Sequence, residues 1–545
     1  MQADPPKEHP DPCVMVVYGA SGDLVARKIV PALFELRQEG SLPDRFALIG
    51  VSRSDMTDQS FRDHLLQKAK DNGSSTDASD DDWQEFTKCI HYCRGNGAEP
   101  DIYPKLSQRI REVADAFDIV PDAYKGQPCP ESPWQGCPNT LFYLSVAPGL
   151  YEPIVNRIGE AGLVHKGGGK YGEPFQDRPW QRIIIEKPIG HDLESALELN
   201  NAVGQVFDER AVYRIDHYLG KELVQNILVM RFANTIFEPL WSNRHVDHIQ
   251  VTAAESVGVG RRAGNFYDNA GATRDMLQSH LLQVMALVAM EAPSEYSPDA
   301  IRREKVKVLD SVVPPDPSPD AREVVLGTYG PSNNHDDEDA GLAYHNLEGV
   351  DPAKKTETFA AMRLRIDNWR WAGTPFYIRS GKKMRSKLTE VTVQFKRPPA
   401  NLFKKFPAFT DNGGRPGNRI VINIAPDEGI GLCFEAKIPG RDFRAGSVKA
   451  DFDYNYVFNS EPIEAYGPLL IDCMRGDKTL FKHRDEVEGA WRIVNDTVHL
   501  TPEQRDLHRY DAGSWGPEAA NDLFLSKRAH DIGGRWHNPS RQDIR

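Results

Sequence analysis

A short stretch of this sequence gathers several groups that bind anions or transfer protons. Asp216, His217 and Tyr218 are consecutive, and Lys221 follows just ahead of a helical pattern of apolar residues. Imidazole, phenol and ammonium groups at the N-terminus of a helix suit a phosphate monoester, because the helix end adds free N–H groups and a partial positive charge. Each residue taken alone is more often structural. Together, His217, Tyr218 and Lys221 predict a site for a phosphate group.

A second candidate for proton transfer is His280. It lies in a helical pattern beside Leu277, Leu281 and Val284, and a single histidine beside such an apolar stripe is usually packed in a core. A neutral imidazole with a pKa near ~6.5 is nevertheless suited to accept a proton at cellular pH. The residues by themselves leave both roles of His280 open.

The first apolar run of the chain leads into a glycine-rich turn that suits a dinucleotide. Gly19 and Gly22 would let the backbone turn tightly and approach a pyrophosphate, and the helix that follows would present its N-terminus to the same group. A Gly-x-x-Gly turn is weak by itself, but its place after the first strand of a β-α-β unit favours a cofactor site. The residues that we expect to contact the cofactor here are Gly19, Ala20, Ser21, Gly22, Asp23 and Leu24.

The end of the second apolar run indicates which dinucleotide is bound. In NAD-binding folds an acidic residue at this place accepts a hydrogen bond from the ribose 2′-hydroxyl. This sequence has Ser52, Arg53 and Ser54 instead. An arginine pairs with the 2′-phosphate of NADP, whereas the alternative is an ordinary solvated side chain. We therefore predict that Arg53 contacts the cofactor and that the cofactor is NADP.

The elements that must position these groups follow two patterns, of which the first covers the N-terminal part. Short apolar runs alternate there with helical patterns, as in a parallel sheet that is covered on both faces. This alternation predicts a doubly wound, Rossmann-like α/β domain over residues 12–215. The expected strands are 14–18, 46–51, 140–144 and 183–185, and the clearest helix contains Ile29, Leu33 and Leu36 and ends at Gly40.

The second pattern begins after residue 215. One long helical pattern covers residues 272–292, and polar and apolar residues alternate at 246–253, 359–366, 390–395 and 419–424. These stretches predict a larger α+β domain over residues 216–545, with a mainly antiparallel sheet and helices on one face. The polar, acidic stretch at residues 72–82 is expected to be a surface insertion.

The composition argues against several other classes of protein. The chain has 545 residues and a net charge of −13, whereas a general nucleic-acid binder presents a basic face. No apolar run approaches the ~18 residues of a membrane span. The seven cysteines lack the CxxC spacing of a structural zinc site. We therefore expect reduced thiols, a cytosolic protein and no metal, with an organelle left open.

Further motifs resemble the glucose-6-phosphate dehydrogenase family over nearly the whole chain. The motif RIDHYLGKE at residues 214–222 is highly specific to that family. The others stand in the family's order: GASGDL at 19–24, EKPIG at 186–190, RDMLQSH at 274–280, RSGKKMRSK at 379–387, EAYGPLLIDCMRGD at 464–477, AWRIV at 490–494 and GRWHNP at 534–539. The resemblance implies oxidation of D-glucose 6-phosphate at C1 to 6-phospho-D-glucono-1,5-lactone with hydride transfer to NADP⁺, which is the first step of the oxidative pentose phosphate pathway.

The resemblance also implies a role for individual side chains. His280 would remove the proton from the C1 hydroxyl, and Asp216 would orient it. Lys187 would lie between the sugar and the nicotinamide, and Tyr143 would lie near the cofactor. The other residues that the resemblance implies for substrate binding are His217, Tyr218, Lys221, Glu255, Asp275, Lys382 and Lys387.

The sequence departs from the family in two places. Some members hold a second, structural NADP⁺ with polar or basic groups, and this chain has Leu388, Thr392, Asn423 and Trp515 at those positions while it keeps Trp536. We therefore expect the second site to be weak or absent. Lys387 replaces an arginine of other members, which keeps the charge but loses the planar fork. The resemblance further suggests a homodimer or homotetramer that forms through the large sheet.

Two other functions are compatible with parts of the sequence. A sugar dehydrogenase of the wider class shares the Rossmann domain and the EKP motif but often acts on sugars without a phosphate, and the cluster of His217, Tyr218 and Lys221 argues against it. A non-catalytic NADPH sensor would keep the glycine-rich turn and lose the base. Asp216 and His280 are both present, so the sensor is the weaker alternative.

Overall fold

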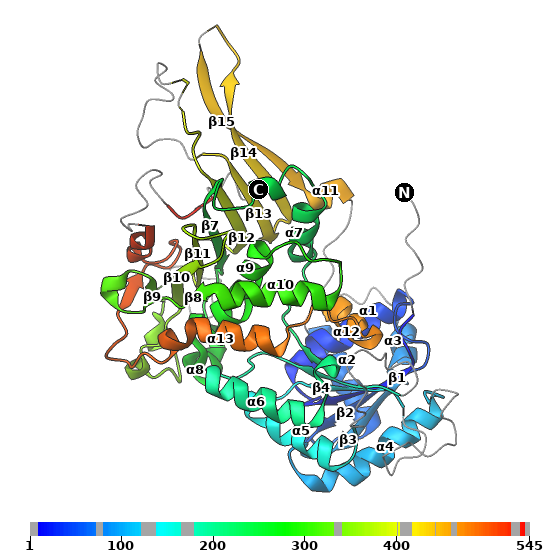
Figure 1. Cartoon of the computed structure of the whole chain (residues 1–545). Helices are drawn as coiled ribbons and strands as arrows, with labels where there is room; N and C mark the ends of the chain where they lie inside the picture. Colours follow the sequence, from blue (N-terminus) through cyan, green and yellow to red (C-terminus); the bar gives the residue numbers. More distant parts are fainter. Residues whose placement is uncertain are drawn as a thin grey trace.

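The structure, a computed structural model, describes residues 9–71, 80–120, 138–164, 179–331, 341–400, 402–403, 417–441, 443–458, 466–524 and 535–539. It contains two sheets, each with its own helices. In Figure 1 the sheet of the N-terminal part lies at the bottom and the larger sheet rises above it. Strands β14 (Gly429–Ile438) and β15 (Arg444–Asp453) protrude at the top.

The N-terminal sheet has six strands in the order β3-β2-β1-β4-β5-β6, and every neighbouring pair is parallel. This confirms the predicted Rossmann-like sheet. The strands are β1 (Cys13–Tyr18), β2 (Phe46–Ser52), β3 (Ile90–Arg94), β4 (Thr140–Leu144), β5 (Gln181–Ile185) and β6 (Val212–Arg214). The sequence pattern missed β3, which mixes polar and apolar residues, and β6, which has only three residues.

Helices cover both faces of this sheet. Val14 and Val16 share a core with α4 (Tyr103–Ala116), α5 (Tyr151–Glu160) and α6 (Leu193–Val206). Met15 and Val17 share a core with α1 (Val30–Gln38), α2 (Asp58–Asp71) and α3 (Asp80–Thr87). The alternation of side chains along β1 therefore produces two cores, as the doubly wound fold requires.

The expected surface insertion at residues 72–82 is only partly within the described structure. Residues 72–79 lie outside it, and residues 80–82 begin α3 instead of lying in a loop. The helix forms here because Trp83 and Phe86 pack on Phe34, with ring centroids 5.0 Å and 5.4 Å apart. Acidic residues in the first turn of a helix are favourable, because they face the positive end of the helix dipole.

The second sheet has ten strands, in the order β15-β14-β13-β12-β7-β11-β10-β9-β16 with β8 paired to β10. Only β7–β11 and β9–β16 are parallel pairs, so the sheet is mainly antiparallel, as predicted. Its remaining strands are β7 (Val246–Ala254), β8 (Val312–Val313), β9 (Val324–Tyr329), β10 (Phe359–Ile366), β11 (Pro375–Gly381), β12 (Leu388–Phe395), β13 (Arg419–Ala425) and β16 (Leu507–Tyr510).

One face of this sheet carries the helices that hold the site. They are α7 (Glu222–Phe232), a helical run made of α8 (Asp268–Ala272), η9 (Thr273–Leu281) and α9 (Leu282–Ala289), and, outside these, α10 (Pro298–Ser311) and α13 (Arg484–Val498). The predicted long helix at 272–292 is therefore present, although it ends at Ala289. It differs from the expectation because η9 is a π-helix and because Gly271, with φ of +64°, kinks the chain just before it.

The C-terminal part of the chain returns to the N-terminal sheet. Helix α12 (Tyr466–Arg475) packs on α1, and Leu469, Leu470 and Cys473 join the core that contains Met15 and Val17. The predicted boundary between residues 215 and 216 stays a prediction. Among the described residues, no helix combines the length and the apolar character that a membrane crossing requires.

Candidate active site

Four of the predicted site residues lie one or two residues after the end of a strand of the parallel sheet. Gly19 follows β1, Arg53 follows β2, Lys187 lies two residues after β5, and Asp216 lies two residues after β6. All these strands run in the same direction, so their carboxyl ends meet at one edge of the sheet. This is the edge at which open parallel sheets bind their ligands.

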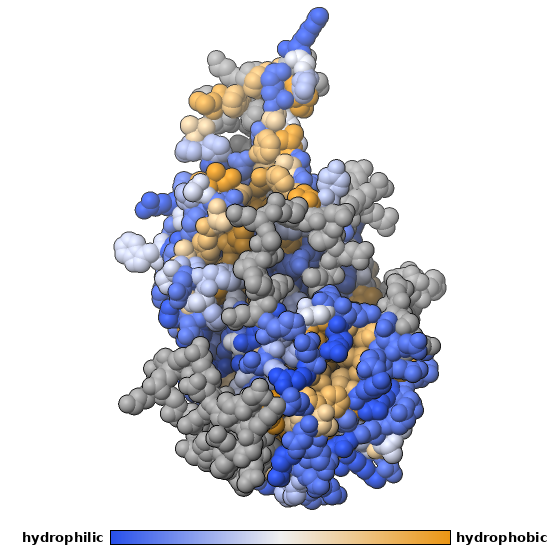
Figure 2. Space-filling view, turned by 90° about the vertical axis from the view of Figure 1, so that its right-hand side faces the viewer, coloured by the Kyte–Doolittle hydropathy of each residue, from blue (hydrophilic) through white to orange (hydrophobic). Residues whose placement is uncertain are grey.

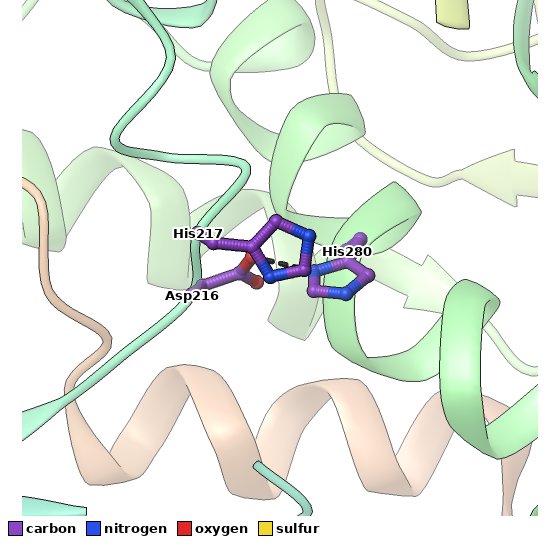
Figure 3. A group of neighbouring side chains, drawn as sticks. All are labelled: Asp216, His217 and His280. Carbon is purple, nitrogen blue, oxygen red and sulfur yellow. Dashed lines mark hydrogen bonds and ion pairs between the residues drawn. The ribbon is translucent and has the colours of Figure 1, made fainter. Parts of the chain in front are cut away.

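At this edge Asp216 contacts His280, which comes from η9, one of the helices on the face of the second sheet (Figure 3). His280 Nδ1 lies 2.5 Å from Asp216 Oδ1, and both side chains are completely buried. The backbone N–H of Tyr218 donates to the same oxygen at 3.0 Å. The contact assigns the Nδ1 proton to the side that faces Asp216, and Nε2 is left as the nitrogen that can accept a proton.

The electrostatics of the pair favour a neutral imidazole beside an ionised carboxylate. Burial by itself raises the pKa of Asp216, but His280 and Lys482 outweigh burial and hold that pKa well below its usual value. Burial, with Lys187 acting in the same direction, lowers the pKa of His280 to about 4, although Asp216 acts in the opposite direction. His280 is therefore free of its second proton at neutral pH, which is the state of a general base.

Lys187 reaches the acceptor nitrogen of this histidine. Its Nζ lies 2.9 Å from His280 Nε2 and 3.1 Å from Asp275 Oδ1. Burial by itself raises the pKa of Asp275, but Lys187 and Lys382 hold that pKa well below its usual value. The structure thus brings together Lys187, Asp275 and His280, which the sequence placed in one site.

His217 and Tyr218 surround the same imidazole. The Tyr218 ring is stacked on His280 with centroids 4.3 Å apart, and the His217 ring meets His280 edge-on at 4.6 Å. Burial lowers the pKa of His217 to about 2, and His280 and Lys187 act in the same direction. His217 is therefore a neutral imidazole in this arrangement, and it can donate one hydrogen bond to an anion.

Two lysines lie close together at the entrance to α7. Lys221 is the residue directly before the helix, and its Nζ lies 4.4 Å from the centre of the Tyr218 ring. Burial lowers the pKa of Lys221, and the nearby ammonium of Lys387 lowers it further, while Glu428 acts against both. Two like charges beside a helix N-terminus form an arrangement that a dianion would stabilise.

Glu255 and Lys382 form an ion pair at the other side of the site. Tyr267 lies near them, with its ring centre 5.6 Å from Lys382 Nζ. The Tyr267 hydroxyl is buried and has no hydrogen-bond partner among the described residues, and Asp275 and Glu255 help to raise its pKa, after burial as the main cause. Tyr267 could not be predicted from the sequence, since an aromatic residue in a helical stretch is typical of a core.

Asp216, His217 and His280 also offer three possible ligand atoms within 4.8 Å of one another. Ammonium groups oppose a divalent cation here, because Lys187 Nζ lies 2.9 Å from His280 and Lys482 Nζ lies 3.4 Å from Asp216. We therefore assign no metal to this cluster, and the expectation of a metal-free protein stays a prediction.

The glycine-rich turn after β1 packs closely against the residues that follow β4. Gly19 has a φ of +79°, and a Cβ atom there would lie 2.0 Å from the Ser145 carbonyl oxygen. Its N–H donates to Val51 O at 2.8 Å, which ties the loop to the end of β2. Ser54 Oγ donates to Ser21 Oγ at 3.2 Å. Arg53, exposed between Ser52 and Ser54, is thereby placed beside the loop, so these residues fit a dinucleotide with a 2′-phosphate.

Two of the predicted cofactor residues lie in other surroundings. Asp23 is mostly exposed and pairs with Lys68 Nζ at 3.0 Å. Tyr143 is completely buried, and its hydroxyl donates to Glu186 Oε1 at 2.5 Å. Tyr143 thus holds the carboxylate that precedes Lys187, and its direct contact with the cofactor stays a prediction.

A parallel sheet with a glycine-rich loop, and a buried Asp–His pair at the same edge, define a nicotinamide-dependent oxidoreductase that acts on an alcohol. The family model described as "Glucose-6-phosphate dehydrogenase, NAD binding domain" matches residues 16–226, and "Glucose-6-phosphate dehydrogenase, C-terminal domain" matches residues 228–537. The chain belongs to the glucose-6-phosphate dehydrogenase family, and its reaction is the NADP-dependent oxidation of glucose 6-phosphate.

Individual relatives match over almost their whole length. Glucose-6-phosphate 1-dehydrogenase of Aggregatibacter actinomycetemcomitans is 39% identical over 529 residues, which cover 97% of this chain and 98% of the relative. A solved structure of glucose-6-phosphate dehydrogenase in complex with glucose 6-phosphate superposes with a TM-score of 0.81 at 31% identity, covering 98% and 100% of the two chains. The enzyme from Mycobacterium avium gives a TM-score of 0.75 at 30% identity, covering 97% and 99%.

Proposed function

We propose that His280 is the general base of this reaction and that Asp216 orients it. The observation that carries the proposal is the 2.5 Å contact between His280 Nδ1 and Asp216 Oδ1 in a completely buried setting. It leaves Nε2 as the acceptor nitrogen, at the edge of the sheet where the glycine-rich loop lies. A base that is held in one tautomer by a second group is the arrangement that general-base catalysis uses.

The proton follows a short path in this proposal. Nε2 of neutral His280 accepts the proton of the C1 hydroxyl, and Asp216 stabilises the imidazolium that forms. Bound NADP⁺ supplies the hydride acceptor. Lys187 is 2.9 Å from Nε2 before substrate binds, so the C1 hydroxyl takes its place on the histidine. Asp275, 3.1 Å from the Lys187 ammonium, holds that ammonium beside the reacting carbon.

The two ends of the sugar phosphate are bound by different groups. Lys221, Lys387 and His217 hold the phosphate, because their donors gather at the N-terminus of α7. Tyr218, in the same cluster, also contacts the phosphate in this proposal. Glu255 and Asp275 accept hydrogen bonds from sugar hydroxyls, and Lys382, which pairs with Glu255, fixes that carboxylate.

The cofactor is held by the loop Gly19–Leu24 and by Arg53 in this proposal. The Gly19 position supports it, because the φ of +79° and the contact with the Ser145 backbone both require glycine at the tight turn between β1 and the helix that follows. Arg53 is exposed, and no ion pair involving it is formed within the described part of the chain. Its guanidinium is therefore available to a 2′-phosphate.

Replacement of His280 by asparagine tests the central assignment. We expect His280→Asn to lower kcat by about 10²–10⁴, because general-base catalysis contributes that much. The affinity for NADPH, measured by its fluorescence, should stay nearly unchanged, since Arg53 and the loop are intact.

A second buried histidine supplies the matched control. His248 Nδ1 lies 2.6 Å from Asp247 Oδ2 in β7, which repeats the His–Asp contact away from the site. His248→Asn should therefore keep kcat within a few-fold of the parent enzyme. Equal losses in both variants would remove His280 from the role of base and reduce it to a structural residue.

We propose in addition that a second, structural NADP⁺ is bound weakly or not at all. Leu388 and Asn423, at two of the positions where some family members have polar or basic groups, line a cavity on the sheet. Carboxylates dominate its remaining charges: Glu390, Asp427, Glu428, Asp451 and Asp453, against Arg419 and Lys449. Such a surface repels the phosphates of a dinucleotide.

We also propose that the chain forms a homodimer or homotetramer through the second sheet. Phe434 on β14 is paired with Val448 on β15, and Ile430 with Phe452, so that all four side chains share one face. Phe434, Val448 and Phe452 are 45%, 39% and 51% exposed. Figure 2 shows hydrophobic side chains gathered along this protruding sheet. A cytosolic location stays a prediction of the sequence.

A further inference from the structure

Asp216 has a second carboxylate oxygen that the contact with His280 does not use. This atom, Oδ2, is buried and accepts no hydrogen bond from the described residues. The group that faces it is the ammonium of Lys482, with Nζ at 3.4 Å. A buried carboxylate is costly without a counter-charge, and Lys482 supplies that charge at the oxygen that His280 does not contact.

Lys482 also contacts the helix that carries the histidine. It is only 4% exposed, and its Nζ donates to Ser279 O at 3.4 Å, one residue before His280 in η9. The same ammonium thus touches the segment after β6 and the helix η9, from which Asp216 and His280 come. The distance between these two side chains depends on how those elements are held together.

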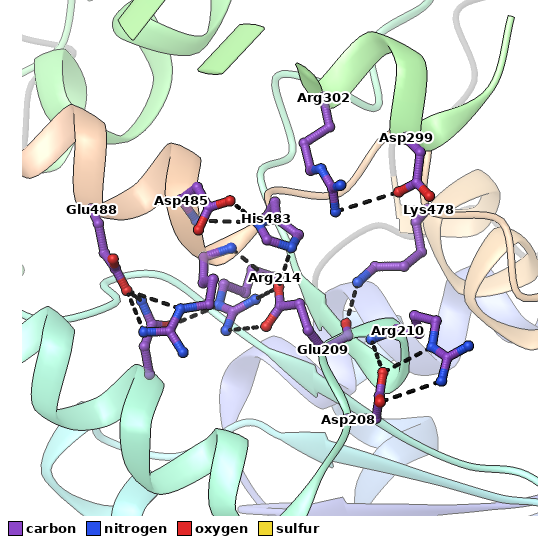
Figure 4. A network of polar contacts seen from close by, with 12 residues as sticks. Asp208, Glu209, Arg210, Arg214, Asp299, Arg302, Lys478, His483, Asp485 and Glu488 are labelled. Carbon is purple, nitrogen blue, oxygen red and sulfur yellow. Dashed lines mark hydrogen bonds and ion pairs between the residues drawn. The ribbon is translucent and has the colours of Figure 1, made fainter. Parts of the chain in front are cut away.

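The backbone of Lys482 is fastened to the strand that leads into Asp216. Lys482 N donates to Arg214 O at 3.1 Å, and the two residues form an antiparallel bridge. The Glu209 carboxylate connects the surrounding segments through hydrogen bonds (Figure 4). It accepts two from the Arg214 guanidinium, at 2.5 Å and 3.1 Å, and one from the backbone N–H of Arg484 at 3.1 Å. Lys478 donates to the Glu209 carbonyl. This network fixes where Lys482 enters the site.

A second buried acid interacts electrostatically with the lysine. Glu486 in α13 is 1% exposed and pairs with Lys305 of α10 at 2.5 Å. Burial lowers the pKa of Lys482, while Asp216 and, more weakly, Glu486 act in the opposite direction and favour the charged ammonium. Lys187 adds to the effect of burial, so the charge of Lys482 depends on its ion pair with Asp216, in which Nζ lies 3.4 Å from Oδ2.

We infer that Lys482 is a positioning residue of the reaction, which fixes Asp216 through its second oxygen and keeps His280 free of its second proton. The inference rests on the proposed role of His280 as the base. Lys482 lies in a basic stretch, Lys482-His483-Arg484, and the sequence alone would place such a side chain on the surface.

The charges around His280 set the direction of the expected effect. They come from Asp216 in the segment after β6, Lys187 after β5, Asp275 on η9 itself and Lys482, with neutral His217 and the Tyr218 ring packed beside them. A cation near a histidine lowers its pKa, so the removal of Lys482 raises the pKa of His280. Protonated His280 accepts no proton, and kcat/KM therefore falls at a higher pH than in the parent enzyme.

The experiment compares the pH profile of kcat/KM for the full-length parent enzyme and for Lys482→Met, Lys482→Gln and Lys482→Arg. We expect the acidic limb to move to higher pH by on the order of one pH unit in Lys482→Met and Lys482→Gln. It should return to the parent position in Lys482→Arg, which keeps the charge. NADPH affinity and the unfolding midpoint show which variants are folded, and Lys482→Gln, which keeps a hydrogen-bond donor, replaces Lys482→Met if that variant does not fold.

Lys307→Met is the control, because it removes an ammonium that pairs with Glu304 on the exposed face of α10 and belongs to neither the site nor the network around Glu209. Its acidic limb should coincide with that of the parent enzyme. If the limb of the charge-removing Lys482 variants also coincides with the parent, Lys482 only fills space and the inference is wrong. That result leaves the role of His280 intact, whereas a fully active His280→Asn would overturn the proposed function itself.

Discussion

At the scale of single residues, the site uses like charges that are held close together. Lys221 and Lys387 lie near enough for the second ammonium to lower the pKa of the first, and Glu428 offsets only part of that repulsion. In the phosphate site that we propose, a dianion between them would relieve this repulsion and would be bound more tightly for that reason.

Loss of one of these charges should weaken substrate binding more than turnover. We expect Lys221→Ala to raise the KM for glucose 6-phosphate by about 10–100-fold, because a hydrogen bond to a charged group contributes about 1.5–3 kcal/mol. Since the contact is the same in ground state and transition state, kcat should change little. Steady-state kinetics measure both. Lys307→Ala, an exposed lysine of α10, is the control, and an equal KM in the two variants would exclude Lys221 from the phosphate site.

Arg53 should act on only one of the two cofactors. Arg53→Ala is expected to raise the KM for NADP⁺ by about 10–100-fold through loss of a charged contact with the 2′-phosphate. The KM for NAD⁺, which has no such phosphate, should stay within a few-fold. Arg45→Ala serves as the control, because Arg45 pairs with Asp118 in the same domain and away from the loop. Parallel losses for NADP⁺ and NAD⁺ would contradict the assignment.

At the scale of elements, a kink decides where the catalytic helix begins. Gly271 adopts a φ of +64°, and Ala272 N donates to Glu357 O at 3.0 Å. The Glu357 carboxylate accepts from Thr273 N at 3.1 Å and pairs with Arg505 at 3.0 Å. This buried acid caps the π-helical segment that contains Asp275 and His280, so it sets the rotation of both side chains.

A methyl group at this kink should disturb the site from a distance. In Gly271→Ala the added Cβ would lie 2.6 Å from the Glu357 carboxylate, in a backbone region that costs a non-glycine residue about 1–3 kcal/mol. We expect a lower unfolding midpoint together with a several-fold loss of kcat. Gly373→Ala, where φ is +86° and no atom lies within 4 Å, isolates the backbone cost. If both variants kept full kcat, the kink would have no part in positioning His280.

At the scale of the whole molecule, two features depend on contacts between distant parts of the chain. Helix α12 and the segment after it return to the N-terminal sheet, and this return places Lys482 behind Asp216. The protruding strands β14 and β15 carry an apolar face that is half exposed in the single chain. An exposed apolar surface of this kind favours association with a second copy.

A charge placed on that face should separate the subunits. We expect Phe452→Glu to shift the oligomer towards smaller species, because a buried unpaired carboxylate opposes association. Light scattering coupled to gel filtration gives the mass of each species. Ile236→Glu introduces the same charge at a side chain that is 67% exposed elsewhere. An unchanged mass for Phe452→Glu would exclude this face as the interface.

The sequence by itself determined the class of both sheets and the elements with regular patterns. Strands β1, β2, β4 and β10 were predictable, because runs of buried residues and strict alternation are local properties. β14 and β15 were not, because they mix glycine and charged residues with apolar ones. Gly19 and Arg53 were also predictable, since their places depend only on the ends of neighbouring strands.

Only the tertiary structure decided which of the candidate residues meet. From the residues alone, His280 was more readily interpreted as a packed histidine than as a base. Its contact with Asp216 depends on how η9 packs beside the end of β6. The places of Lys482 and Tyr267 in the site could not be predicted from the sequence, because a lysine in a basic stretch and a tyrosine in a helix are common at structural positions. Burial, distance and the resulting pKa shifts depend on elements far apart in the chain, and no local pattern of residue types encodes them.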